Sequence, residues 1–154
     1  MNNLELRVIG NIETDDGFKI KINKEYVNAL KGISDFKYIQ VVYWFDKVDN
    51  RDLIVENKPY KKGTEELGVF ATRTPFRPNP IGIETVYLQN ADLENGVLCI
   101  PYIDAFNNTP VLDIKPYMPS IDRVETPDMP EWCKNWPDCY EKSGEFNWED
   151  VFNF

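Results

Sequence analysis

Residues 68–82, in the middle of the chain, combine side chains that bind anions with residues that fix the backbone. The stretch reads GVFATRTPFRPNPIG and holds three prolines, two arginines and an asparagine. Proline lacks a backbone donor and fixes φ, so neither a strand nor a helix accommodates this many. We therefore expect a rigid irregular loop, called the proline-rich loop below, which has little entropy left to lose on binding a ligand.

The side chains of the proline-rich loop suit an anionic or nucleotide-like ligand. Arg73 and Arg77 can each form bidentate hydrogen bonds with a carboxylate or phosphate. Phe76 can stack on a base, and Asn79 can hydrogen-bond to a base edge. The alternative is a surface loop whose arginines only pair with nearby acids. The sequence contains neither a P-loop nor a Gly-rich dinucleotide fingerprint.

A second polar group falls on a predicted strand over residues 109–117. Asp113, Lys115 and Tyr117 are spaced by two, so in a strand they project to one face. They form either part of a reaction site or a satisfied Asp–Lys ion pair.

The composition excludes several classes of chemistry. The chain has no histidine, which rules out Ser–His and Cys–His nucleophile pairs and the usual mixed zinc sites. Proton transfer therefore falls to carboxylate, Lys, Tyr, Cys or water. Three scattered cysteines make neither a disulfide framework nor a thiolate metal site, so we expect no metal and a reduced, cytoplasmic protein. We find no apolar run of the ~20 residues that span a bilayer and no signal peptide.

Charge is distributed unevenly along the chain. The net charge of −9 argues against a general nucleic-acid binder. Residues 58–83 nevertheless carry five bases against two acids, whereas residues 120–154 carry nine acids against three bases. Lys58, Lys61 and Lys62 could therefore form an anion-binding patch with the two arginines; the alternative is a solvated face.

The sequence around these groups predicts a mainly β fold: a single β-barrel-like domain with one short helix. The helix is expected over residues 24–31, capped by Asn23 and followed by Gly32. A turn at residues 15–17 predicts a hairpin, and residues 38–45 read as a strand buried on most of both faces. The expected strands are 4–14, 18–22, 38–45, 52–56, 68–72, 81–90, 97–103 and 109–117.

The chain's last part reads differently from the rest. Seven aromatic residues lie between residues 132 and 154, and Pro137 interrupts their helical spacing, which favours two short helical turns with Pro137 opening the second. We expect a domain over residues 1–119 and an irregular or helical aromatic extension over 120–154. This extension would pack its rings on the barrel or on a dimer partner.

Three stretches resemble the TsaA-like (TrmO-type) family. The proline-rich loop matches that family's typical GVFATRSPFRPNPIG except at Thr74. The stretch TPVLDIKPYMP, residues 109–119, resembles the family's DGTPVLDIKPYLP, and residues 30–48 resemble its helix end and following strand more weakly. The resemblance as a whole covers about residues 6–119.

The resemblance implies an S-adenosylmethionine-dependent methyltransferase on a β-barrel, usually a homodimer, that methylates threonylcarbamoyl-adenosine beside the tRNA anticodon. Cofactor contacts would come from the loop, where the methionine carboxylate needs a cationic or backbone-donor partner. Lys115 would hold an anionic substrate group, Asp113 would orient a ribose hydroxyl or take the amine proton, and the lysine patch would contact RNA. The cofactor residues expected are Arg73, Phe76, Arg77, Asn79, Pro80 and Ile81.

The chain also departs from the family pattern. Two family histidines are Tyr38 and Asp46 here, and the family's Asp–Gly before TPVLD is Asn107–Asn108. We also expect the acidic tail to stand in place of the C-terminal domain of longer members. These changes bear on the tRNA substrate more than on the cofactor. Two further hypotheses therefore stand beside the first: a small-molecule methyltransferase, and a non-catalytic module that binds S-adenosylmethionine or a nucleotide.

Overall fold

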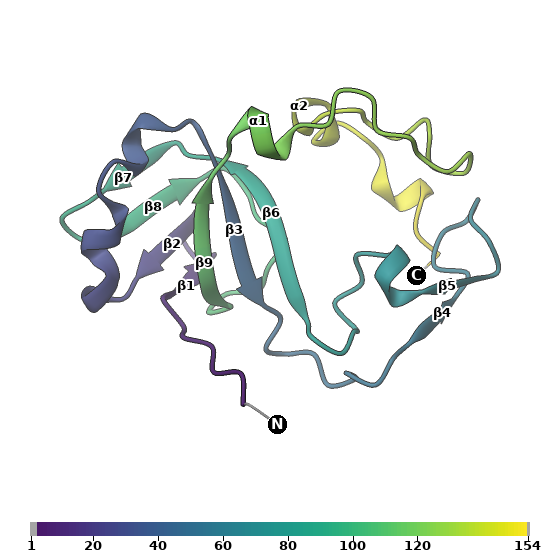
Figure 1. Ribbon diagram of the computed structural model, residues 1–154, viewed down its shortest axis with the longest axis horizontal. Coiled ribbons are helices and arrows are strands. Elements are labelled where there is room, and N and C mark those ends of the chain that lie inside the picture. The colour runs from purple at the N-terminus through teal and green to yellow at the C-terminus, as the bar shows by residue number, and fades with distance from the viewer. Residues whose placement is uncertain (1–2, 154) are drawn as a thin grey trace. The chain divides into compact units, whose positions relative to one another are not determined.

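The computed structural model describes residues 3–153, which form two compact units (Figure 1). The first, called the sheet unit, consists of Met1–Val48 and Pro80–Asp122. The second, called the loop unit, consists of Asp49–Asn79 and Arg123–Phe154. Each unit is thus built from two separate stretches of the chain, and the proline-rich loop runs from one unit into the other.

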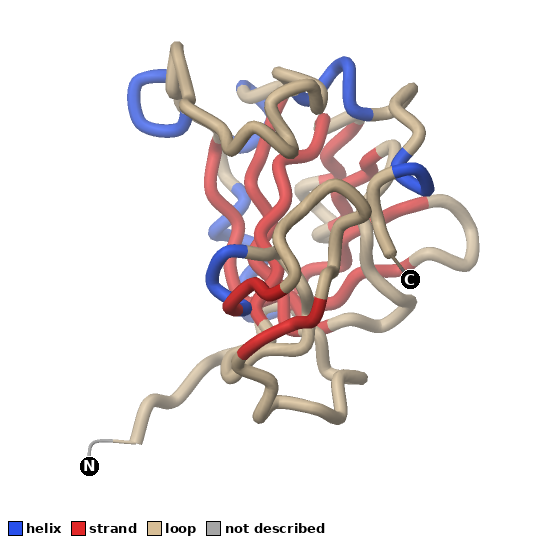
Figure 2. The backbone as a smooth tube through the Cα atoms, turned by 90° about the vertical axis from the view of Figure 1, so that its right-hand side faces the viewer, coloured by secondary structure: helices blue, strands red, loops and turns tan. Residues whose placement is uncertain are grey.

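The sheet unit contains one seven-stranded antiparallel sheet, seen as the neighbouring red strands of Figure 2. Its spatial order is β6-β3-β9-β1-β2-β8-β7, which confirms the mainly β prediction. Within the described residues β6 and β7 remain the two edges, so closure into a barrel is not confirmed. The strands are β1 Gly10–Glu13, β2 Phe18–Ile22, β3 Tyr38–Trp44, β6 Ile81–Tyr87, β7 Asn90–Asp92, β8 Val97–Ile100 and β9 Pro110–Pro116.

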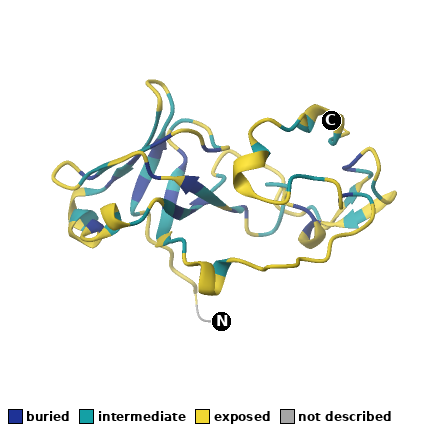
Figure 3. Cartoon of the chain, turned by 90° about the horizontal axis from the view of Figure 1, so that it is seen from above, coloured by how far each residue is buried: buried dark blue, intermediate teal, exposed yellow. Residues whose placement is uncertain are grey.

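The core of the sheet unit follows from alternation along the strands. In β3, Ile39, Val41 and Tyr43 are buried while the residues between them are half-buried. The strand therefore has one buried face rather than the two that its apolar run predicts. In Figure 3, many of the buried residues, drawn in dark blue, lie on the strands of the sheet unit. The core is made of Ile12, Ile20, Ile22, Leu30, Ile39, Val41, Tyr43, Val86, Leu88, Leu98, Ile100, Ile103 and Val111.

The short helix predicted over residues 24–31 is present as a 3-10 helix, η1 Lys24–Leu30. Its predicted cap is wrong: Asn23 makes no side-chain cap, and its amide donates to the Val8 carbonyl at 3.0 Å instead. Strand β1 begins at Gly10 rather than at residue 4, and Leu4 is 86% exposed. The alternation of apolar and polar residues before Gly10 suggested a strand, but a strand also needs a neighbouring strand to pair with, and pairing begins only at Gly10. A 3-10 turn, η2 Ile33–Asp35, and a one-turn helix, α1 Pro119–Asp122, complete the sheet unit.

The loop unit contains little regular structure. Strand β4 Val55–Asn57 pairs antiparallel with β5 Glu66–Gly68, and the C-terminal stretch adds α2 Tyr140–Ser143 and η4 Trp148–Asp150. The strand predicted over residues 68–72 is wrong: η3 Val69–Ala71 is a 3-10 turn, closed by the Thr72 N–H donating to the Val69 carbonyl. Helix α2 begins at Tyr140 rather than at Pro137.

Candidate functional site

The proline-rich loop is folded around the guanidinium group of Arg77. This half-buried group donates to the Val69 carbonyl and, at 3.2 Å, to the Thr72 carbonyl. Both acceptors belong to the loop itself. In this structure Arg77 therefore shapes the loop backbone, whereas the sequence predicts it as a ligand contact.

Two threonine hydroxyls continue this internal network. The buried Thr72 hydroxyl donates to the Val69 carbonyl at 3.1 Å and accepts the Thr74 N–H at 3.3 Å. The Thr74 hydroxyl in turn accepts the Phe76 N–H at 3.3 Å. Serine and threonine both supply this hydroxyl, so Thr74 keeps what the family's serine would offer.

Arg51, which the sequence did not single out, also holds the loop. Its Nε and Nη2 donate to the Pro78 carbonyl at 3.2 and 3.0 Å. This acceptor cannot be found from a sequence pattern, because the donor comes from a distant stretch. Arg51 is therefore a structural contact that only the fold reveals.

The remaining predicted cofactor residues divide between the two units. Arg73, Phe76 and Asn79 are exposed on the loop unit, with Phe76 41% exposed. Pro80 and Ile81 belong to the sheet unit, where the buried Pro80 accepts the Phe45 N–H at 2.8 Å and Ile81 begins β6. The outward-facing side chains of the loop thus offer a cation, a ring and an amide.

Gly82, which ends the proline-rich loop, is required by an aromatic ring. A Cβ at this position would lie 2.5 Å from both Cε2 and Cζ of Tyr43 and 3.0 Å from a Phe45 ring atom. The two rings pack edge to face at 5.1 Å. The glycine therefore lets Tyr43 lie directly over the start of β6.

Tyr43 is also the centre of a polar group that sequence reasoning missed. Its hydroxyl donates to the Asp104 carbonyl at 3.2 Å and lies 3.4 Å from Glu84 Oε2, which accepts the Asp104 N–H at 3.0 Å. Burial, and then the nearby Glu84 carboxylate, raise the pKa of Tyr43 well above its usual value. The phenol is accordingly a neutral donor at pH 7.

The predicted reaction residues Asp113 and Lys115 form an ion pair on β9. Lys115 Nζ lies 2.7 Å from Asp113 Oδ2, and this hydrogen bond raises the pKa of Lys115. The Lys115 side chain is 64% exposed and the Asp113 side chain 47% exposed, so solvent screens the attraction between them. Tyr117 follows the end of β9, where its N–H donates to the Tyr38 carbonyl at 3.0 Å.

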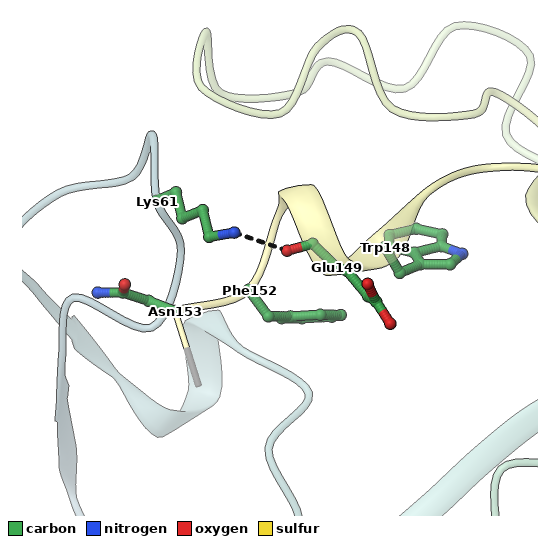
Figure 4. A pocket seen from close by; sticks show the side chains of 5 residues that line it. All are labelled: Lys61, Trp148, Glu149, Phe152 and Asn153. Carbon is green, nitrogen blue, oxygen red and sulfur yellow. Dashed lines mark hydrogen bonds between the residues drawn. The ribbon is translucent and has the colours of Figure 1, made fainter.

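Two of the three predicted substrate lysines have protein partners. Lys58 Nζ lies 3.4 Å from Glu65 Oε1, and Lys61 Nζ donates to the Glu149 carbonyl at 2.7 Å (Figure 4). Lys62 is exposed. Lys61 lines a cavity of about 500 Å³ together with residues of the C-terminal stretch: Trp148, Glu149, Phe152 and Asn153.

Residues 3–153 offer neither a metal-ligand cluster nor a membrane-spanning helix. No group of three or more His, Cys, Asp or Glu side chains there is placed to hold a metal ion. In the same part of the chain no helix has the length and apolarity needed to cross a membrane.

Residues 9–123 match the family model described as tRNA-methyltransferase O N-terminal domain. This match covers most of the chain and includes the whole proline-rich loop and strand β9. The chain therefore belongs to this family, as its motifs indicate.

Named relatives and a solved structure agree with the family. A probable S-adenosyl-L-methionine-binding protein of Archaeoglobus fulgidus is 43% identical over 69% of this chain and 28% of its own length. The tRNA (adenine(37)-N6)-methyltransferase of Mus musculus is 33% identical over 67% of this chain and 24% of its own. A crystal structure of TrmO aligns with a TM-score of 0.68 and 28% identity, covering 82% of this chain and 63% of that one. The chain thus spans only a part of each.

Proposed function

We propose that this chain is an S-adenosylmethionine-dependent methyltransferase whose proline-rich loop binds the cofactor. The observation that carries the proposal is the family match over residues 9–123, in which the loop is retained almost residue for residue. Relatives named as S-adenosyl-L-methionine-binding proteins support the choice of cofactor.

The exposed loop residues fit the chemistry of this cofactor. Arg73 would pair with the methionine carboxylate, Phe76 would stack on the adenine and Asn79 would bond to its edge. Arg77 would not contact the cofactor directly; it would hold the loop in shape by donating to the Val69 and Thr72 carbonyls. When bound, the cofactor supplies an electrophilic methyl group, so the chain's own task is positioning and exclusion of water.

The Asp113–Lys115 pair suits the acceptor. A substrate anion at Lys115 would replace Asp113 as its partner. The Asp113 carboxylate would then be released to accept a hydrogen bond from a ribose hydroxyl or to take the amine proton. Tyr117, at the end of the same strand, would border this group.

The acceptor proposed first is threonylcarbamoyl-adenosine beside the tRNA anticodon, methylated on its exocyclic nitrogen by a cytoplasmic homodimer. The name of the mouse relative supports a tRNA substrate. The test is to incubate the protein with methyl-labelled cofactor and total cell extract. Label recovered at that nucleoside supports the proposal, and light scattering with cofactor present tests the dimer.

A small-molecule acceptor is the second candidate, and the net charge of −9 favours it because phosphate backbones are repelled. Label in small molecules but not in RNA would select it. Cofactor binding in calorimetry without transfer of label to any fraction would instead identify a binding module.

A further inference from the structure

A second cavity in the loop unit is lined mainly by aromatic rings of the C-terminal stretch. Its volume is about 310 Å³, and all of its lining residues belong to the loop unit. Eight of its ten lining residues lie beyond residue 123, where the family match ends. Its aromatic residues are the buried Tyr60 and the half-buried Trp132, Trp136 and Phe146. The chemistry of the family domain therefore does not account for this cavity.

The ring planes that line the cavity stand close to right angles to one another. The Trp136 ring lies at 70° to Tyr60 and at 76° to Trp132, with centroid distances of 5.4 and 5.6 Å. In a T-shaped pair one ring meets its partner with its edge, so this contact leaves that ring's own faces uncovered. Half-buried rings arranged in this way keep π surface for a ligand.

Backbone hydrogen bonds hold the wall around Tyr60 in place. Tyr60 and Phe152 form an antiparallel β-bridge. The Lys61 N–H donates to the carbonyl of Val151, which itself lines the cavity, at 2.9 Å. A cavity whose walls are already bonded loses little entropy when a ligand enters it.

The charges at the cavity favour a cation. Two carboxylates, Glu131 and Asp150, line it together with one ammonium group, that of Lys62. Glu131 pairs with Lys134, whereas Asp150 accepts a hydrogen bond at 2.8 Å from a neutral side-chain amide, which leaves its charge uncompensated by that partner. Residues 120–154 as a whole carry nine acids against three bases. This negative field attracts a cation and repels a phosphate.

We propose that this cavity binds a small quaternary ammonium cation, whose methyl groups pack on the rings while Asp150 balances the charge. Tryptophan is the aromatic residue that attracts cations most strongly, and quaternary ammonium groups are the cations that aromatic cages recognise. A primary ammonium group is strongly hydrated, and the rings cannot replace its hydration, whereas a quaternary one has no N–H group to satisfy. The site is separate from the proposed function, since neither the proline-rich loop nor the Asp113–Lys115 pair lines it.

The first experiment compares choline with its neutral analogue, in which a tert-butyl group replaces the trimethylammonium group at nearly the same shape. NMR titration of the full chain with choline should shift the indole N–H signals of Trp132 and Trp136 and leave that of Trp44, in the sheet unit, unchanged. The neutral analogue should bind about tenfold more weakly, as for loss of a partly desolvated cation–π contact. Equal affinity for the two overturns the proposal. Tighter binding of adenosine monophosphate than of choline at the same signals also overturns it, in favour of a nucleotide site.

Asp150→Asn tests the charge without changing the shape of the side chain. The variant should bind choline about threefold or more weakly, because a carboxylate close to the cation is lost, and should bind the neutral analogue like the wild type. Glu141→Gln is the matched control, since it removes the same charge from an exposed residue of α2 outside the cavity lining. It should bind choline like the wild type. Equal losses in the two variants would mean that net charge alone attracts the cation, which overturns the site.

A competition experiment separates this site from that of the cofactor. S-adenosylmethionine carries a methylated sulfonium cation, so it is the ligand most able to imitate choline here. Saturating S-adenosylmethionine should leave the choline affinity and the Trp132 and Trp136 shifts unchanged. Displacement of choline by S-adenosylmethionine overturns a separate site, whereas a chain that binds choline but not S-adenosylmethionine upholds this inference and contradicts the proposed function.

Discussion

Arg73 and Arg77 are four positions apart in one loop, yet their surroundings differ. Arg73 is exposed, while Arg77 donates to two carbonyls of the loop. Arg73→Ala should weaken S-adenosylmethionine binding about tenfold or more, as for loss of a charge-assisted contact of ~1.5–3 kcal/mol. Arg77→Ala should weaken binding and also lower the melting temperature. Calorimetry and thermal unfolding check both.

Arg77→Lys is the matched control for this pair. Both hydrogen bonds come from one guanidinium nitrogen, Nη2. A lysine keeps the charge, but its flexible stem lacks the rigid planar group that places this nitrogen. It should therefore behave like Arg77→Ala in the melting experiment. Wild-type stability in the Arg77→Lys variant would show that charge, rather than the planar guanidinium group, is what the loop requires.

Gly82 gives a prediction about stability alone. An alanine would press into the Tyr43 ring at 2.5 Å, inside a packed core that has no room to move. Gly82→Ala should destabilise the protein by about 1–3 kcal/mol. Gly144→Ala is the control, since nothing lies within 4 Å of its Cβ and its φ of −69° suits alanine. Denaturant unfolding of both variants measures the difference; equal stability would contradict the contact.

Asn108 shows how this chain accommodates a family glycine. It occupies the position of that glycine with φ +67°, and its N–H donates to the Ile12 carbonyl at 2.7 Å. Asparagine tolerates the left-handed region better than other side chains. Asn108→Gly should leave stability almost unchanged, whereas Asn108→Ala should cost about 1 kcal/mol. A melting experiment in which alanine is tolerated as well as glycine would refute this explanation.

At the scale of elements, strands are predicted most accurately from the sequence where apolar and polar residues alternate and the segment also has a strand to pair with. Strand β9 and the paired part of the β1–β2 hairpin match their predicted positions closely. The prediction fails at residues 69–72, where apolar residues suggested a strand. There the Arg77 guanidinium and the Thr72 hydroxyl both bond to the Val69 carbonyl, so a turn replaces the ladder. Such side-chain competition is not visible in a hydrophobic pattern.

The residues of the candidate site likewise fall into those that the sequence could select and those that it could not. Arg73, Phe76 and Asn79 could be selected from residue type, because a rigid loop exposes its side chains. Arg51 could not, since it bonds to the loop from a separate stretch and carries no local motif. The Asp113–Lys115 spacing predicted a shared face, and the structure shows the ion pair that this spacing permits.

On the scale of the whole molecule, charge limits how RNA could be held. The chain carries −9, and of the three patch lysines Lys58 and Lys61 already have acceptors in the loop unit. Lys61 also bonds to the C-terminal stretch, so replacing it disturbs that contact as well as the charge. Any RNA binding therefore has to work with few phosphate contacts per protomer.

We expect RNA binding to be weak and sensitive to salt for this reason. Each phosphate contact on a single strand contributes about −0.7 to the log–log salt slope, so three lysines give at most about −2 per protomer. A Lys58, Lys61 and Lys62 triple-alanine variant should flatten this slope and lose most RNA affinity while retaining cofactor binding. The control removes the same charge at Lys24, Lys31 and Lys37, which are exposed on the sheet unit, and should change the slope little. Filter binding of tRNA over a salt series measures both. If both triple variants lower affinity equally, net charge alone explains the binding; a slope indifferent to salt would favour the small-molecule acceptor.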